Sequence, residues 1–144
     1  MKISSKGHYG LLALAELADN YRQHRAVQVR EIAGNQQIPL QYLGQIMVLL
    51  KRGHLVTAAR GPSGGYVLAR PPETISVKEI LSVLEGPEIG FELKAQMHGR
   101  SMSRVTKRLI ETWARGVRSL ETVLEETTLA DLCRPEVPVL MYYI

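Results

Sequence analysis

Apolar side chains recur every three or four positions along several stretches of this chain, which is the spacing of an α-helix with one buried face. The first stretch covers residues 5–24, and Ser4 or Ser5 is placed to cap it. A longer stretch covers residues 103–127, where the apolar positions form one continuous stripe. The members of the stripe are Val105, Leu109, Trp113, Val117, Leu120 and Leu124. The pattern predicts a mainly helical protein with a long helix near its C-terminus.

Two shorter helices are predicted very close together between these stretches. The first covers about residues 29–36, and the second begins with Pro39 as its first residue and ends near Gly53. Only Gln37 and Ile38 separate them, and two short helices with so brief a connection form a helix-turn-helix. Polar side chains that lie largely off the apolar face of the second helix are candidates for contact with DNA: Gln41, Tyr42, Gln45 and Arg52.

A β-hairpin is predicted directly after the second of these helices. The apolar runs HLVTAA and YVLA flank a loop of sequence RGPSGG, whose glycines permit a tight turn and a close approach of the backbone to another molecule. Helix, helix-turn-helix and hairpin follow one another in the order of a winged helix. We therefore expect the hairpin to be a wing that approaches the backbone or the minor groove of DNA. Its candidate contacts are Arg60, Gly61, Ser63, Gly64 and Gly65.

The composition changes after the hairpin and suggests how the chain is divided. Ser76 and Glu79 have the spacing of a capping box before a short apolar helix, which closes a winged helix-turn-helix domain over residues 1–86. Residues 87–102 show no sustained period and are predicted to be a loop. Residues 103–144 hold the long helix and a C-terminal tail.

The long helix is predicted to join two copies of the chain. About 24 helical residues span roughly 36 Å, which is more than so small a domain can cover. The same stripe on a second copy would complete its burial, so the sequence favours a homodimer with two-fold symmetry and a palindromic DNA site. The alternative is a stripe that packs back on its own domain. The apolar tail VPVLMYYI, beyond a short helical turn capped by Thr128, is expected at the dimer seam.

Charge and composition narrow the class of function. The chain has a formal net charge of +4, and its first 70 residues carry nine lysines and arginines against three acidic residues. A basic first half favours a polyanionic partner such as DNA, and the alternative is a solvated basic face. No apolar run approaches the roughly 20 residues of a membrane span, and no secretory leader is visible, so a cytoplasmic protein without membrane contact is expected.

The residues able to carry chemistry argue against an enzyme and against a metal site. The single cysteine, Cys133, excludes an internal disulfide and a cysteine-only metal site, and it is more typical of a small buried residue than of a sensor. The four histidines lack ligand spacing with one another. The glycine loop is followed by a strand, whereas nucleotide-binding loops open a helix. No cofactor and no catalytic residue are predicted.

Five segments of the sequence resemble a known family: MKISSKGHYGLLALAELA, YLGQIMVLLKRGHLV, RGPSGGYVLAR, ISVKEILSVLEGP and TTLADL. They are similar to the bacterial winged-helix regulators that include the iron–sulfur-cluster assembly regulator, the nitric-oxide-sensing repressor and the repressor of cysteine metabolism. The resemblance implies a homodimeric DNA-binding transcriptional regulator with a winged helix-turn-helix domain and a long dimerisation helix. It also implies that Ser5 and Lys6 lie near phosphates, that the outer face of helix 39–52 enters the major groove, and that residues 60–65 form the wing.

The sequence departs from this family in two places. Many members hold an iron–sulfur cluster with three cysteines before the long helix, but residues 86–102 contain none, and His98 is the one soft ligand there. The resemblance therefore points to the cluster-free, cysteine-metabolism branch, which implies a repressor of sulfur metabolism and a metabolic enzyme as a further partner. Gly44 stands where the family commonly shows a glutamate, so the operator sequence does not transfer from relatives.

Each candidate contact has a plainer alternative. Arg60 could be a solvated loop arginine, Gln41 and Gln45 could be surface glutamines, and Tyr42 suits packing as well as a phosphate contact. Trp113 lies in register with the long stripe and is interpreted as a dimer-core residue. A second class of function uses the same fold as an interaction module that docks a metabolic enzyme, with DNA binding secondary.

Overall fold

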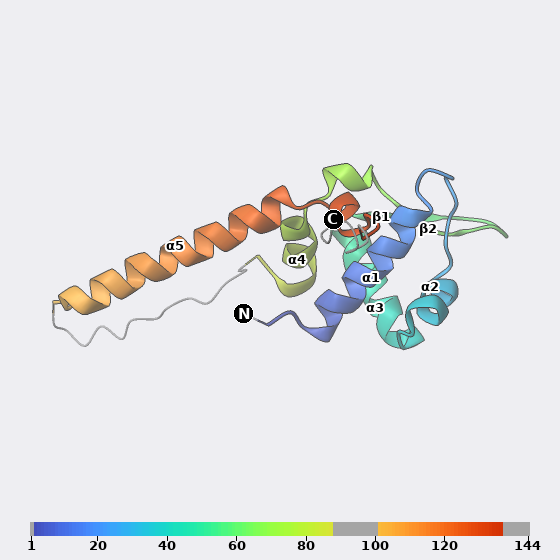
Figure 1. The fold of residues 1–144 in the computed structure, drawn as a ribbon. Helices are drawn as coiled ribbons and strands as arrows, with labels where there is room; N and C mark the ends of the chain where they lie inside the picture. The colour runs from blue at the N-terminus through green and yellow to red at the C-terminus, as the bar shows by residue number, and fades with distance from the viewer. Residues whose placement is uncertain (1, 88–100, 137–144) are drawn as a thin grey trace.

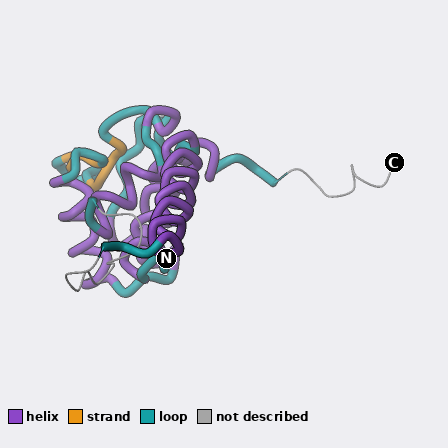
Figure 2. Tube along the Cα trace, turned by 90° about the vertical axis from the view of Figure 1, so that its left-hand side faces the viewer, coloured by secondary structure: helices purple, strands orange, loops and turns teal. Residues whose placement is uncertain are grey.

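The computed structural model describes residues 2–87 and 101–136 as a helical body from which one long helix extends (Figure 1). Its elements are α1 (Ser5–Asp19), α2 (Val29–Gln36), α3 (Leu40–Arg52), β1 (Val56–Ala59), β2 (Gly65–Leu68), the 3₁₀ helix η1 (Pro72–Thr74), α4 (Val77–Glu85), α5 (Arg104–Glu126) and α6 (Leu129–Leu132). Figure 2 shows the two strands at one edge of the helical body. The predicted fold class, mainly helical with one β-hairpin, is confirmed. Most of the predicted loop and the whole apolar tail VPVLMYYI lie outside the described residues.

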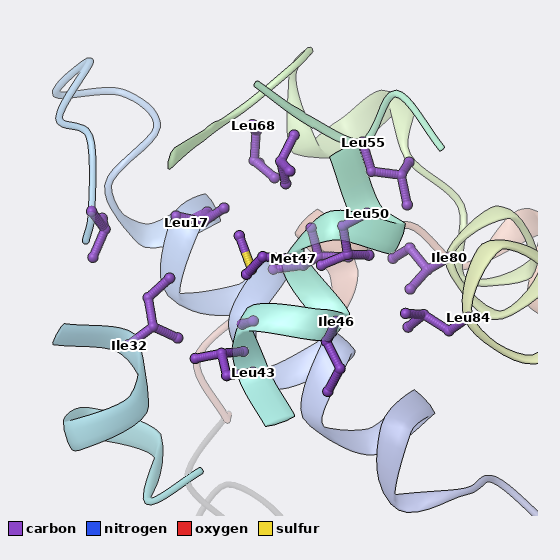
Figure 3. Packing of buried hydrophobic residues seen from close by; sticks show 14 of the residues in the cluster. Leu17, Ile32, Leu43, Ile46, Met47, Leu50, Leu55, Leu68, Ile80 and Leu84 are labelled. Atoms are coloured by element: carbon purple, nitrogen blue, oxygen red, sulfur yellow. The ribbon is translucent and has the colours of Figure 1, made fainter. Parts of the chain in front are cut away.

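The core forms around α3, which packs against α1, α2 and α4 (Figure 3). Four side chains of α3 at spacings of three and four residues are completely buried: Leu43, Ile46, Met47 and Leu50. The side chains that meet them come from the surrounding helices and include Leu14, Leu17, Ile32, Ile80 and Leu84. Because one face of α3 is fixed in this way, the opposite face is held outward in a defined orientation.

The turn between α2 and α3 is made by a single residue in an uncommon conformation. Gln37 has a φ of 55°, in the left-handed region, and its N–H donates to the carbonyl of Ala33. Ile38 is buried directly afterwards, which fixes the turn against the core. Helix α3 begins at Leu40, one residue later than predicted, and Pro39 is its N-cap and not its first helical residue. The helix-turn-helix itself is confirmed.

Helix α1 begins after the Ser4 cap, as predicted, but it ends at Asp19, so the prediction of a helix to residue 24 is wrong. The Asn20 side chain donates a hydrogen bond of 2.9 Å to the carbonyl of Glu16, which is the kind of local bond by which asparagine competes with the helix. At residue 24 itself, the backbone of a histidine takes a positive φ of 51°. The apolar period continued through Tyr21, and for that reason the pattern overran the true end.

The wing consists of two antiparallel strands and one further backbone contact. Val56 of β1 lies opposite Leu68 of β2, which confirms the predicted hairpin. In addition, the Val27 N–H donates to the Tyr66 carbonyl at 2.9 Å, and the Tyr66 N–H donates to the Val27 carbonyl at 2.8 Å. Because Val27 lies between α1 and α2, this bridge ties the wing to the start of the helix-turn-helix. The sequence did not predict it, since one bridged residue has no alternating pattern.

Helix α4 begins at the predicted cap, but the predicted capping box is incomplete. The Ser76 hydroxyl accepts a hydrogen bond from the Glu79 N–H at 3.1 Å, whereas the Glu79 carboxylate forms an ion pair with Arg70. A complete box caps α6 instead: the Thr128 hydroxyl accepts from the Asp131 N–H at 3.1 Å, and the Asp131 carboxylate accepts from the Thr128 N–H at 2.9 Å. The bonds from the N–H and hydroxyl of Thr128 hold the pKa of the Asp131 carboxyl below its ordinary value.

Helix α5 confirms the predicted long helix. It starts after Ser103, whose hydroxyl accepts a hydrogen bond from the Thr106 N–H at 3.1 Å, and it runs for 23 residues. Its first turns leave apolar side chains in solvent, because Val105 is 75% exposed and Leu109 is 51% exposed. The beginning of the predicted stripe therefore has little cover from its own domain.

The end of α5 is attached to the body. Leu124 packs against Val77 and Leu81 of α4. Next to this contact, the Val77 N–H donates to the Thr127 carbonyl at 2.8 Å, and the first turn of α6 is anchored by Leu129, which is completely buried. The stripe is thus divided: its last turns follow the alternative of packing on the parent domain, and its first turns do not.

Candidate nucleic-acid interface

Helix α3 turns a line of exposed side chains away from the core. Gln41, Gln45 and Arg52, three of the predicted DNA contacts, are all exposed. Their separations of four and seven residues place them in one row along the helix, opposite the buried face. Val48 belongs to the same row and is 44% exposed, although the sequence reasoning did not select it. The row is the right size and polarity to lie in a DNA major groove, which admits one α-helix.

Tyr42 does not belong to this row. Its side chain is half-buried and packs against the hydrophobic core. Its ring meets that of Tyr9 edge to face, with the ring centres 5.8 Å apart and the planes at 80°. This contact joins α1 to α3 and gives Tyr42 a packing role, while its contact with a phosphate stays a prediction.

Two of the glycines in the wing loop serve the hairpin itself. A Cβ atom at Gly64 would lie 2.6 Å from the carbonyl oxygen of Ala59, and one at Gly65 would lie 2.5 Å from that of Val27. Gly61 differs, because its φ of 105° requires glycine while the space around it is open. Close packing of the wing backbone therefore explains why glycine stands at positions 64 and 65 of the loop.

The basic side chains at the end of α3 and in the wing are available for phosphate. Ion pairs occupy Arg25, with Glu31, and Arg70, with Glu79. Within residues 2–87 and 101–136, in contrast, no carboxylate lies within 4.0 Å of the charged groups of Lys51, Arg52 and Arg60, all of which are exposed. Ser63 is exposed beside Arg60 at the tip. The end of α3 therefore offers Lys51 and Arg52 to an anionic partner, and the wing offers Arg60.

The start of α1 carries the candidates Ser5 and Lys6. Ser5 is exposed and Lys6 is half-buried. The preceding Ser4 is held by Glu85 at the end of α4, whose carboxylate accepts from the Ser4 hydroxyl at 2.6 Å and from the Ser4 N–H at 2.9 Å. The hydroxyl bond is the main cause of a lowered pKa of the Glu85 carboxyl. This contact, between residues 81 positions apart, fixes the start of α1 and left no signal in the sequence.

Cys133 lies half-buried after α6, among hydrophobic core side chains. Burial, and secondly the charge of Asp19, raise the pKa of the Cys133 thiol. A raised pKa favours the neutral thiol, which is the unreactive form of cysteine. The structure agrees with a packing role for this residue.

Comparison with known proteins identifies the group to which this arrangement belongs. A family model described as Rrf2, iron-dependent transcriptional regulator, matches residues 3–135. The chain belongs to the Rrf2 family of transcriptional regulators. The match extends from the start of α1 through α6, so it includes the outward row of α3, the wing and the long helix.

Relatives in the Rrf2 family cover nearly the whole chain. The HTH-type transcriptional regulator IscR of Cereibacter sphaeroides is 36% identical over 141 residues, covering 94% of this chain and 89% of its own. The HTH-type transcriptional regulator CymR of Bacillus subtilis is 36% identical over 132 residues, covering 92% and 89%. The solved structure of CymR, titled the global cysteine regulator of B. subtilis, has a TM-score of 0.79 at 34% identity and covers 92% of this chain and 96% of that one.

Membership of the Rrf2 family places the chain among DNA-binding transcriptional regulators and not among enzymes. Among the helices that the structure describes, none has both the length and the apolar composition to cross a membrane.

Proposed function

We propose that this protein is a homodimeric repressor that recognises a palindromic DNA site. The observation that carries the proposal is the exposed polar row of α3, in a chain whose wing exposes Arg60 with no carboxylate of residues 2–87 and 101–136 within 4.0 Å of it. In each half-site, α3 lies in the major groove, where Gln41 and Gln45 hydrogen-bond to base edges, most favourably to adenine. Arg60 and the wing tip contact the flanking backbone or minor groove, and Ser5 and Lys6 contact phosphates at the start of α1.

The proposed dimer forms through the first turns of α5. Val105, Leu109 and Trp113 are all exposed there, and burial against a second copy removes this apolar surface from water. Two-fold symmetry then presents two α3 helices to successive turns of the duplex. Val117 and Leu120 are half-buried and continue the seam towards Leu124.

We propose further that the dimer works without an iron–sulfur cluster. The family description names iron, but a cluster of the usual kind needs several thiolates and this chain has one cysteine, whose raised pKa opposes ligation. Among residues 2–87 and 101–136, no three His, Cys, Asp or Glu side chains come together as a metal site. Likeness to the structure titled global cysteine regulator supports target genes of sulfur metabolism. Membership of a family of transcriptional regulators supports a cytoplasmic location.

Replacing Arg60 with alanine is expected to weaken binding to every DNA sequence by about tenfold, because one phosphate contact per subunit is lost. The slope of log K against log[salt] should become shallower by about 0.9 per lost phosphate, or about 1.8 for the dimer. Fluorescence anisotropy across a salt series, on one specific and one random duplex, measures both quantities. A slope equal to that of the wild-type protein would contradict a phosphate contact.

Replacing Gln45 with alanine is expected to act differently, since a base contact gives preference and a phosphate contact does not. Discrimination at one base pair in each half-site should fall by about tenfold, with the salt slope unchanged. Selection of bound sequences from a random pool shows the relaxed position. Equal loss of preference in the Arg60 and Gln45 variants would refute this division of roles.

The second candidate function is a protein-docking module, and the exposed start of α5 is the observation that favours it. No feature within residues 2–87 and 101–136 indicates that an enzyme, and not a second copy of the chain, binds to the exposed start of α5. The salt series separates the two functions: several phosphate contacts give a steep dependence on salt, whereas a docking module gives a shallow one with any DNA.

A further inference from the structure

The outward row of α3 contains one apolar side chain, Val48, which cannot form hydrogen bonds. Val48 is 44% exposed and lies between Gln45 and Arg52, three residues after one and four before the other. It takes no part in the core, whose α3 members lie on the opposite face. A partner that fits this row must therefore offer polar atoms on both sides of an apolar one.

The surface beside Val48 is also apolar and open. Gly44 precedes it by one turn, and a Cβ atom added there would meet nothing within 4 Å. Glycine is unfavourable inside a helix compared with alanine, and no contact with the residues that the structure describes requires glycine here. Leu40, one turn earlier again, is 46% exposed. Leu40 and Val48 thus place apolar surface along the polar row, with Gly44 between them. Because Gly44 has no side chain, another molecule can come close to the α3 backbone there.

The chemistry of the major groove supplies one matching group. Base edges there are donors and acceptors, except for the C5-methyl group of thymine. We propose that Val48 contacts the C5-methyl group of a thymine in each half-site, and that the open backbone at Gly44 lets α3 come close enough for this contact. This specificity role rests on the proposed function, in which α3 occupies the major groove.

Deoxyuridine provides the test, because it lacks only the methyl group of thymidine and keeps the hydrogen-bonding atoms. The preferred duplex of the 144-residue chain is first found by selection from a random pool. Each thymine is then replaced by deoxyuridine at the symmetric positions of both half-sites, and Kd is measured at fixed salt. One pair of positions should raise Kd about 15-fold, which corresponds to about fourfold for each methyl group removed.

Protein variants assign the methyl contact to its side chain. Val48→Ala should bind the thymine and deoxyuridine duplexes equally at that position, whereas Val48→Ile should keep the preference for thymine. Val123→Ala is the matched control, because Val123 is an exposed helical valine on α5, at 59% exposure, and outside the row of α3. It should discriminate as the unchanged protein does.

Two results would overturn the inference. One is a preferred duplex in which no thymine responds to deoxyuridine, and the other is a response that persists in Val48→Ala. Both leave the proposed function standing, since specific binding is still seen. Failure of the selection to yield any preferred duplex would instead remove the proposed function and this inference together.

Discussion

Replacing Leu109 with glutamate is expected to convert the proposed dimer into monomers and to weaken binding to the operator by at least about 100-fold. Leu109 is half exposed in the free chain, so the substitution leaves the domain folded. In the dimer, each copy would lose about 2 kcal/mol of leucine burial and would place a carboxylate in an apolar seam. Sedimentation equilibrium and a duplex titration measure the two effects.

Arg118→Gln is the control for Leu109→Glu. It changes the net charge by the same one unit on the same helix, and Arg118 is exposed on the side away from the stripe. This variant should remain dimeric. A Leu109→Glu protein that sediments as an intact dimer would show that the copies meet elsewhere, and the proposed seam along α5 would have to be abandoned.

Replacing Gly65 with alanine is expected to lower the free energy of unfolding by about 3 kcal/mol. The φ of 151° at Gly65 is unfavourable for any side chain, and the new Cβ atom would lie 2.6 Å from the carbonyl carbon of Val27. Relief of the clash requires separation of Val27 from Tyr66 and the loss of both their hydrogen bonds. Urea denaturation followed by circular dichroism gives the change.

Gly61→Ala is the matched control in the same loop. Gly61 has a φ of 105° but open space around it, so alanine there meets strain without a clash and should cost only about 1 kcal/mol. If the two variants unfolded at the same urea concentration, the bridge between Val27 and Tyr66 would contribute nothing measurable to the attachment of the wing.

The features that the sequence predicted well are those encoded by local pattern. The bounds of α2 and α5 followed from the apolar period. Thr128, which was predicted to cap the last helical turn, does so because its hydroxyl reaches an N–H group only three residues away. The exposed row of α3 was predicted for the same reason, since the buried face of a helix determines the opposite one.

The features that the sequence missed depend on residues far apart in the chain. Glu79 pairs with Arg70 and so leaves its capping box, and Glu85 holds Ser4 across 81 positions. Val27 pairs with the wing through backbone atoms alone, which no side-chain pattern records. Val48 was overlooked for a different reason: a single exposed valine has no meaning until the surrounding row is known.

The attachment of α5 at one end makes it a lever. Its joint lies where Leu124 meets α4 and where Val77 bonds to Thr127, and from there the helix projects for 23 residues. At 1.5 Å per residue, a rotation of about 5° at this joint moves the far end by about 3 Å. In a dimer joined through the first turns of α5, the distance between the two α3 helices would thus depend on this angle in each subunit.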